Sequence, residues 1–315
     1  MPTVVVLGAG AIGGLYAAHL GHVATVWAVD PWAAHVAAIN AGGLKLEGRG
    51  ATTVTEVRAV TEAAALRGMS VDLVVVAVKS TDTRAAVGAL APELAGRPVW
   101  LSVQNGLGNE EVIAEIAGGP VLQGMTMNAA TVLAPGRIRH EVAGPTWFGP
   151  HTGVGVDEVQ WVAELLRAGG MEPRLEADPR GAIWTKLLFN VGLNAVTALT
   201  RLPSARLVEI EEMRELIAGV IREGMAVAER LGIRLEEDPV ELATRPRRSG
   251  GPAHFASMAQ DIFRGRPTEI DALNGAIVRL AEAHGLSAPL NRAITALIRG
   301  LERSPWREMA IPEDA

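Results

Sequence analysis

The chain has 315 residues, a length that favours two domains over one. Hydrophobic residues make up 49% of it and charged residues 20%, a balance that excludes an intrinsically disordered protein. The net charge of -6 argues against a protein that coats nucleic acid, because such binding needs a basic surface. The absence of cysteine excludes disulfides, thiolate metal sites and a thiol nucleophile. Only three of the 29 basic residues are lysines, namely Lys45, Lys79 and Lys186.

Residues 3–18 carry no charge but are expected to be neither a signal peptide nor a membrane anchor. A signal peptide needs a basic amino-terminal region, whereas the first basic residue here is Lys45. A spanning helix needs about 20 apolar residues, and glycines interrupt this run. We therefore expect a cytoplasmic protein with no membrane partner.

The same stretch predicts a buried strand over residues 3–7, a glycine turn and a helix over 11–20. Glycines at this spacing let a backbone approach a pyrophosphate at a helix amino terminus, although a tight strand–helix turn alone also favours glycine. Because the turn lies between an apolar strand and a helix, we interpret it as a dinucleotide-binding loop. Its candidate cofactor-binding residues are Gly8, Gly10, Ala11, Ile12 and Gly13.

A second predicted strand, residues 25–29, ends in Asp30, 17 residues beyond Gly13. A carboxylate at this distance accepts hydrogen bonds from the adenosine ribose and repels a 2′-phosphate. Asp30 is also a good amino-terminal cap for a helix that begins at Pro31 and Trp32, and both roles are compatible. No Lys or Arg lies between Asp30 and Asn40, so the local chemistry favours NAD(H) over NADP(H).

Two further predicted strands, residues 71–78 and 98–103, are followed by Lys79 and Asn105. Each residue could be an ordinary strand end or turn. Because open α/β sheets bind ligands at the carboxyl ends of their strands, we interpret the pair as part of the same site as the glycine loop.

The remaining patterns divide the chain near residue 176. Strand-like segments near 119–126, 137–142, 146–148 and 172–175, with a helix over 157–168, continue the alternation of strands and helices, whereas helical periodicity alone follows. The predicted fold is α/β. It has an amino-terminal Rossmann domain with a doubly wound parallel sheet (1–176), followed by an all-helical, substrate-binding domain (177–315).

An apolar helix over residues 183–194 carries Lys186, Asn190 and Asn194 on one face, because they are spaced four residues apart. A lysine in such a helix is costly to bury without a purpose, although it could also extend its ammonium to solvent beside the two amides. Downstream, residues 257–262 are expected to end a helix before Gly265, and Glu269 is expected in the first turn of the next helix, where a carboxylate is ordinary.

Taken together, these motifs resemble the ketopantoate reductase (2-dehydropantoate 2-reductase) family over essentially the whole chain. The motifs are the glycine loop, Lys79, Asn105, the run Trp184-Thr185-Lys186-Leu187 with Asn190 and Asn194, and Ser257-Met258 twelve residues before Glu269. The resemblance implies that Lys186 is the general acid, because an ammonium can release a proton where a guanidinium cannot. It implies that Glu269 orients substrate and lysine, and that it also lies in the cofactor site.

The resemblance further implies substrate contacts from Asn105, Asn190, Asn194 and Ser257, and cofactor contacts from Lys79 and Asn105. It implies NADP(H), usually held by an arginine at the end of the second strand, where this chain has Asp30. Two alternatives remain: a related enzyme acting on a different 2-oxo or 3-hydroxy acid, and a nicotinamide-binding regulatory protein without chemistry. We expect no metal and no nucleic-acid partner, and a homodimer is possible.

Overall fold

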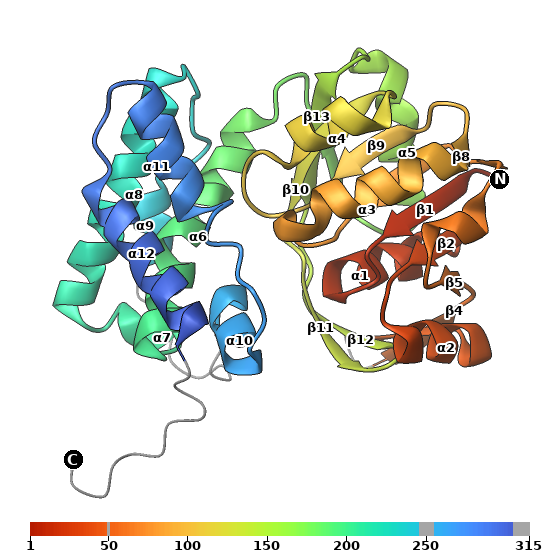
Figure 1. Cartoon of the computed structure of the whole chain (residues 1–315), viewed down its shortest axis with the longest axis horizontal. Coiled ribbons are helices and arrows are strands. Elements are labelled where there is room, and N and C mark those ends of the chain that lie inside the picture. Colours follow the sequence, from red (N-terminus) through yellow and green to blue (C-terminus); the bar gives the residue numbers. More distant parts are fainter. Residues whose placement is uncertain (49–50, 246–254, 305–315) are drawn as a thin grey trace, which may run out of the picture. The chain divides into compact units, whose positions relative to one another are not determined.

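The structure is a computed structural model that describes residues 1–48, 51–245 and 255–304. The chain divides into two compact units, Met1–Pro179 and Arg180–Ala315. The boundary predicted from the sequence, residue 176, lies three residues before the end of the first unit. Figure 1 shows the strands gathered in the first unit and long helices in the second. Each unit is described separately below.

The first unit is built on an eight-stranded sheet with the order β14-β13-β10-β9-β7-β1-β2-β5. Its strands are β1 (Thr3–Leu7), β2 (Thr25–Val29), β5 (Arg58–Val60), β7 (Leu73–Val76), β9 (Val99–Ser102), β10 (Val121–Thr126), β13 (Thr146–Thr152) and β14 (Pro173–Leu175). All neighbours are parallel except β10 and β13. The chain winds outward from β1 in both directions, which confirms the predicted Rossmann-type sheet.

A second sheet and a short strand pair, which the sequence patterns did not predict as such, complete the strands of this unit. The four-stranded sheet has the order β11-β12-β3-β4, and β6 pairs with β8. The bounds are β3 (Leu44–Gly48), β4 (Ala51–Thr55), β6 (Met69–Ser70), β8 (Leu94–Ala95), β11 (Ala129–Ala134) and β12 (Arg137–Val142). Strands β3, β4 and β12 have exposed residues on at least one face and β11 is only half-buried, so the hydrophobic signal of this sheet is weak.

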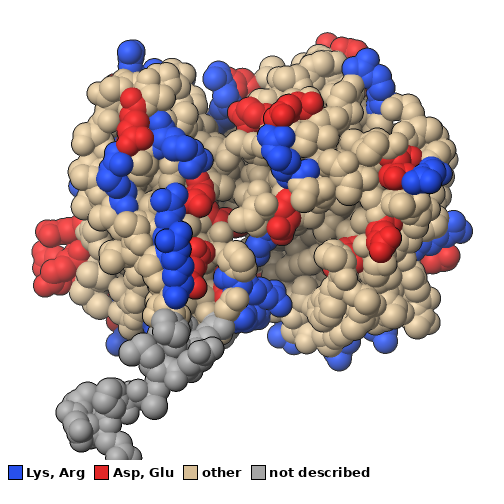
Figure 2. Space-filling view, viewed as in Figure 1, with Lys and Arg blue, Asp and Glu red and all other residues tan. Residues whose placement is uncertain are grey.

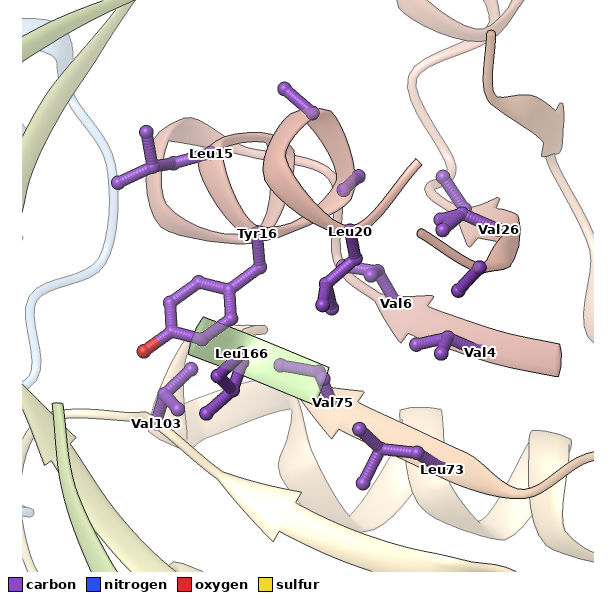
Figure 3. Close-up of a cluster of buried hydrophobic side chains, with 14 of the residues drawn as sticks. Val4, Val6, Leu15, Tyr16, Leu20, Val26, Leu73, Val75, Val103 and Leu166 are labelled. Carbon is purple, nitrogen blue, oxygen red and sulfur yellow. The ribbon is translucent and has the colours of Figure 1, made fainter. Parts of the chain in front are cut away.

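The helices of the first unit follow the strands in alternation. They are α1 (Ala11–Leu20), α2 (Ala33–Gly42), α3 (Thr83–Leu90), α4 (Asn109–Ala117) and α5 (Gln160–Ala168), with 3₁₀ turns η1 (Ala63–Leu66), η2 (Ser80–Asp82), η3 (Ala91–Glu93) and η4 (Asp157–Val159). Figure 3 shows side chains of α1, including Leu15, Tyr16 and Leu20, over the apolar residues of β1 and β7. This packing fixes the start of α1 relative to the carboxyl end of β1.

The predicted start of the second helix is wrong by two residues. Helix α2 begins at Ala33, and both Pro31 and Trp32 lie before it in the chain. The reason is that the Asp30 carboxylate accepts the backbone N–H of Trp32 at 2.9 Å while Trp32 keeps an extended conformation. Asp30 therefore caps the turn that leads into the helix instead of the helix itself.

The second unit is helical throughout its described residues. Its helices are α6 (Arg180–Thr200), α7 (Ser204–Leu207), α8 (Glu211–Arg230), α9 (Pro239–Thr244), α10 (Ser257–Arg264), α11 (Asn274–Ala283) and α12 (Pro289–Arg303). Helix α6 contacts α8, α9, α10 and α12 and is the centre of the unit. It is long and apolar enough to cross a membrane, but 72% of its most apolar window is buried inside the protein, as in the core helix of a soluble protein.

Two glycines let α6 and α8 pack closely. A Cβ on Gly192 of α6 would lie 2.6 Å from Ile221, and a Cβ on Gly224 of α8 would lie 2.2 Å from Leu188. Both distances are well inside van der Waals contact, so a larger residue at either position would have to displace the Ile221 or Leu188 side chain. The close contact fixes the polar face of α6 described below.

Of two local expectations in this unit, one is confirmed and one is wrong. Ser257 is the first residue of α10, which then ends before Gly265 as predicted. Glu269 lies in a turn and not in a first helical turn, because α11 begins only at Asn274. The turn is separated from α11 by Leu273, whose backbone is not helical (φ −101°, ψ −101°).

Candidate active site

The glycine loop connects β1 to α1 and shows three different reasons for glycine. Gly8 has φ +90°, a conformation that L side chains rarely adopt. A Cβ on Gly13 would lie 1.7 Å from the carbonyl oxygen of Gly8, so only glycine permits α1 to pack this closely. A Cβ on Gly10 would meet nothing within 4 Å.

The open space at Gly10 matters because this residue is the amino-terminal cap of α1. No side chain caps the helix there, and its first turn includes Ala11 and Ile12. A helix amino terminus with uncapped N–H groups and free space in front of its backbone can accept a phosphate. The three glycines therefore match the tight turn, the close ligand approach and the helix–strand contact of a pyrophosphate loop.

Asp30 lies beside this loop, at the carboxyl end of β2. Its Oδ2 accepts the backbone N–H of Ala9 at 2.8 Å, and its Oδ1 accepts the N–H of Trp32 at 2.9 Å. The carboxylate thus joins the glycine loop to the segment before α2. Each oxygen has a further lone pair, so both can still accept a hydroxyl from a ligand.

His35 of α2 supports the same loop from its other side. The backbone N–H of Gly136 donates to Nδ1 at 3.1 Å, so Nε2 carries the proton and donates to the carbonyl oxygen of Ala9 at 3.0 Å. The ring is completely buried, and burial lowers the pKa of His35, which keeps the imidazole neutral. Sequence reasoning missed this residue, because its partner lies 101 positions away.

Lys79 and Asn105 follow the adjacent strands β7 and β9, as predicted. The backbone carbonyl of Asn105 accepts hydrogen bonds from the Ser80 hydroxyl at 2.9 Å and from the Asn109 amide at 3.1 Å. Ser80 comes directly after Lys79, so these contacts tie the two strand ends together. The structure brings both predicted residues to the edge of the sheet that holds the glycine loop.

A buried hydrogen-bond chain lies beneath that edge. The Gln104 amide donates to the Val78 carbonyl at 2.9 Å and to the Thr83 hydroxyl at 2.7 Å, and the Thr83 hydroxyl donates to Asn109 at 2.9 Å. Sequence reasoning assigned no role to these residues. The available signal was the placement of Gln104 and Thr83 just after two apolar strands, where polar side chains are buried only with partners.

In the second unit, α6 carries Lys186, Asn190 and Asn194 four residues apart, as predicted. Burial lowers the pKa of Lys186 to about 8, and the negative charge of Glu269 opposes that shift. At neutral pH the Lys186 side chain is therefore mostly protonated, yet it holds its proton far less tightly than an ordinary lysine does. A titratable cation with a pKa near the working pH suits proton transfer to a substrate.

Asn194 is 5% exposed, and its side chain makes no hydrogen bond to the described part of the chain. Within the described ranges, the fully buried side-chain polar atoms without a hydrogen-bond partner are Trp100 Nε1 and Asn274 Oδ1. Because the Asn194 amide is not among them, its polar atoms keep access to solvent. A buried amide with this access can bind a polar ligand. Asn190 is half-buried one turn earlier, on the same face of α6.

The other two predicted residues come from neighbouring segments. Helix α10, which begins with Ser257, contacts α6, and Ser257 is exposed. Glu269, in the turn before α11, is half-buried and close enough to influence the charge of Lys186. No group of three His, Cys, Asp or Glu residues able to hold a metal occurs in the described ranges.

Comparisons with known proteins agree with this division. The model "Ketopantoate reductase PanE/ApbA" matches residues 4–153, and "Ketopantoate reductase PanE/ApbA C terminal" matches residues 178–302. The 2-dehydropantoate 2-reductase of Halobacterium salinarum is 36% identical over 303 residues, covering 95% of this chain and 99% of that protein. That of Pyrococcus horikoshii is 32% identical, covering 94% and 96%.

Solved structures give the same result. The PanE/ApbA family ketopantoate reductase of Ralstonia eutropha JMP134 has a TM-score of 0.86 and 36% identity, and covers 95% of this chain and 98% of its own. A D-mandelate dehydrogenase solved with NADH and anilino(oxo)acetate shares the fold, with a TM-score of 0.88, 23% identity and the same coverage. With both family models matched in order along its length, the chain belongs to the ketopantoate reductase family, whose members are nicotinamide-dependent reductases.

Proposed function

We propose that the protein reduces 2-dehydropantoate to D-pantoate with a reduced nicotinamide cofactor, in the cytoplasm, as part of pantothenate and coenzyme A synthesis. The observation that carries this proposal is the half-buried, titratable Lys186 on the same helix face as Asn190 and Asn194, with Glu269 acting on its charge. When bound, the cofactor supplies the hydride that reduces the 2-oxo carbon.

Lys186 supplies the proton in this proposal. Its ammonium donates a hydrogen bond to the carbonyl oxygen, stabilises the negative charge that develops there, and then protonates it. Lys186 is left neutral and is reprotonated from solvent before the next turnover. Its pKa of about 8 keeps it mostly protonated at pH 7 while making proton release easier than from a lysine in water. Glu269 orients the ammonium and, by its charge, keeps the pKa from falling further.

Neutral hydrogen-bond donors and acceptors bind the rest of the substrate. In this proposal the carboxylate and hydroxyl of the substrate are bound by Asn190 and Asn194 of α6, by Ser257 of α10 and by Asn105. The accessible, otherwise unbonded amide of Asn194 supports this assignment. The glycine loop, Lys79, Asn105 and Glu269 bind the cofactor, the loop holding its pyrophosphate at Gly10, Ala11 and Ile12.

We further propose that the cofactor is NAD(H). Asp30 presents a carboxylate where an arginine would bind a 2′-phosphate, and its oxygens suit ribose hydroxyls. The neighbouring strand β5 ends at Val60 and is followed by Thr61 and Glu62, so the adjacent strand adds no positive charge at this corner. A 2′-phosphate at this corner would therefore face the Asp30 carboxylate, whereas Arg58, the cation of β5, lies beside Trp27 at the start of that strand.

The test is oxidation of NADH by 2-dehydropantoate with wild type, Lys186→Ala and a matched control, Lys45→Ala. Lys45 is an exposed lysine of β3, so its variant controls for loss of a lysine charge. We expect Lys186→Ala to lower kcat by roughly 10²–10⁴ and Lys45→Ala to have no effect. Equal rates for wild type and Lys186→Ala would refute the assignment of the acid.

The same assay separates the two other candidate functions. Turnover of a different 2-oxo or 3-hydroxy acid, with none of 2-dehydropantoate, would identify a related enzyme of other specificity. Tight NADH binding without turnover of any such acid would identify a regulatory protein. Dimerisation of the chain stays a prediction that size-exclusion chromatography can check.

A further inference from the structure

Trp32 is an exposed aromatic residue at the carboxyl edge of the sheet, two positions after Asp30. It is 45% exposed, and the neighbouring Pro31, Ala33 and Ala34 are exposed as well. A large apolar side chain in such an open position gains little from burial within the chain. Packing of the protein core therefore does not explain why a tryptophan stands there.

The Trp32 ring is nevertheless held in one orientation. Its backbone N–H is bound by Asp30, and its indole is stacked on the His35 imidazole with the ring centroids 5.0 Å apart and the planes 9° from parallel. His35 is itself fixed by two hydrogen bonds, to Ala9 and Gly136. Because His35 covers one face of the indole, the exposed part of Trp32 lies on its other face and its edges.

We propose that this outer face of Trp32 is the stacking platform for the adenine of the cofactor. The inference rests on the proposed function, in which the glycine loop holds the pyrophosphate and Asp30 the adenosine ribose. The base attached to that ribose must lie next to Asp30, and a flat, preorganised indole is the surface that a purine ring stacks on. His35 is a positioning residue, since it orients the platform and the Ala9 carbonyl together.

The first test is calorimetric binding of NADH, 5′-AMP and reduced nicotinamide mononucleotide to the full chain. Loss of a base–aromatic stack weakens binding by roughly ten- to a hundredfold. We expect Trp32→Ala to lose that much affinity for NADH and AMP, and none for the mononucleotide, which lacks adenine. Trp32→Phe, which keeps a flat ring, should retain most of the affinity. Unchanged AMP affinity in Trp32→Ala would overturn the proposal.

A fluorescence experiment covers the case in which Trp32→Ala does not fold. AMP should quench part of the wild-type tryptophan emission, and this quench should disappear in Trp32→Phe. The matched control is Trp161→Phe, because Trp161 lies with Met1, Pro2 and Asp72 around a separate pocket at the opposite edge of the sheet. A quench that persists undiminished in Trp32→Phe would overturn the proposal.

These results are independent of turnover. If wild type reduces 2-dehydropantoate but Trp32→Ala binds AMP normally, the adenine platform is wrong and the proposed function stands. If Trp32→Ala loses AMP affinity but wild type reduces no 2-oxo acid, the platform stands and the proposed function fails. If Trp32→Ala dissociates a dimer and leaves AMP affinity unchanged, Trp32 is a subunit contact and the platform is wrong.

Discussion

The negative charge of Glu269 raises the pKa of Lys186, while burial lowers that pKa to about 8. The two residues lie 83 positions apart, on α6 and in the turn before α11. The two opposing effects on this pKa together set the protonation state of the proposed acid at neutral pH.

The rate of 2-dehydropantoate reduction should fall as the pH rises through about 8, because the acid must be protonated to act. Glu269→Gln removes the charge that raises the pKa of Lys186, so the decline should begin at lower pH. Profiles of kcat against pH for both proteins check this. A Glu269→Gln profile shifted to higher pH, or no shift, would contradict the assigned interaction.

Two alanine substitutions in the glycine loop should act differently. Gly10→Ala adds a methyl group into open space, so the chain should fold with unchanged Tm but bind NADH more weakly, because the methyl group would meet the phosphate. Gly13→Ala places a Cβ against the Gly8 carbonyl and should lower Tm by several degrees. Thermal melts and NADH titrations of both variants test this difference. Equal losses of Tm in the two variants would contradict the separate roles assigned to Gly10 and Gly13.

Asp30→Asn should weaken the binding of NADH. It should also reduce the preference of the enzyme for NADH over NADPH, because the carboxylate that repels a 2′-phosphate is gone. The amide can still accept one backbone N–H, but its NH₂ group cannot replace the second acceptor for Ala9 and Trp32. We therefore expect kcat/KM to fall for NADH without a full gain for NADPH. A wild-type enzyme that strongly prefers NADPH would show that Asp30 only binds the backbone N–H groups of Ala9 and Trp32 and does not select the cofactor.

Glu110, buried in the first turn of α4, makes stability depend on pH. Burial raises the pKa of its carboxyl to about 7, so the folded chain binds this proton more tightly than the unfolded chain. The stability contribution is therefore present below the ordinary pKa and is lost as the pH rises from about 4.5 to 7, by on the order of 3 kcal/mol.

Glu110→Gln should flatten that part of the stability curve and make the chain more stable than wild type at pH 8. Urea unfolding at pH 5 and pH 8 measures both effects, and Glu111→Gln, on the same turn of α4 but exposed, is the matched control. A steep slope that remains in Glu110→Gln would place its source in another group.

The sequence predicted the elements whose hydrophobic pattern is strong. Strands β1 and β2 and helix α1 begin and end as predicted, because apolar runs bounded by glycine or charge leave few alternatives. The start of α2 and the position of Glu269 were wrong. Before α2 the Asp30 side chain binds a backbone N–H, and before α11 the backbone of Leu273 is not helical; hydrophobic periodicity reveals neither feature.

The candidate site divides in the same way. Lys186, Asn190 and Asn194 could be predicted because a helix places every fourth residue on one face. Glu269 could be associated with them only by family resemblance, since no local pattern brings it to α6. The supporting residues Thr83, Gln104 and Asn109 escaped prediction because the hydrogen bonds that join them to one another span 21 to 26 positions.

The hydrogen bond from the Gly136 backbone to His35 has a consequence for how the first unit folds. The glycine loop is encoded by the first residues of the chain, yet one of its supports needs a donor 101 residues beyond His35. Contacts of such sequence separation form late, after the loop closure entropy has been overcome. During synthesis this support of the loop is therefore completed only after the β11–β12 turn has left the ribosome, so the loop reaches its final form only when the chain through Gly136 is in place.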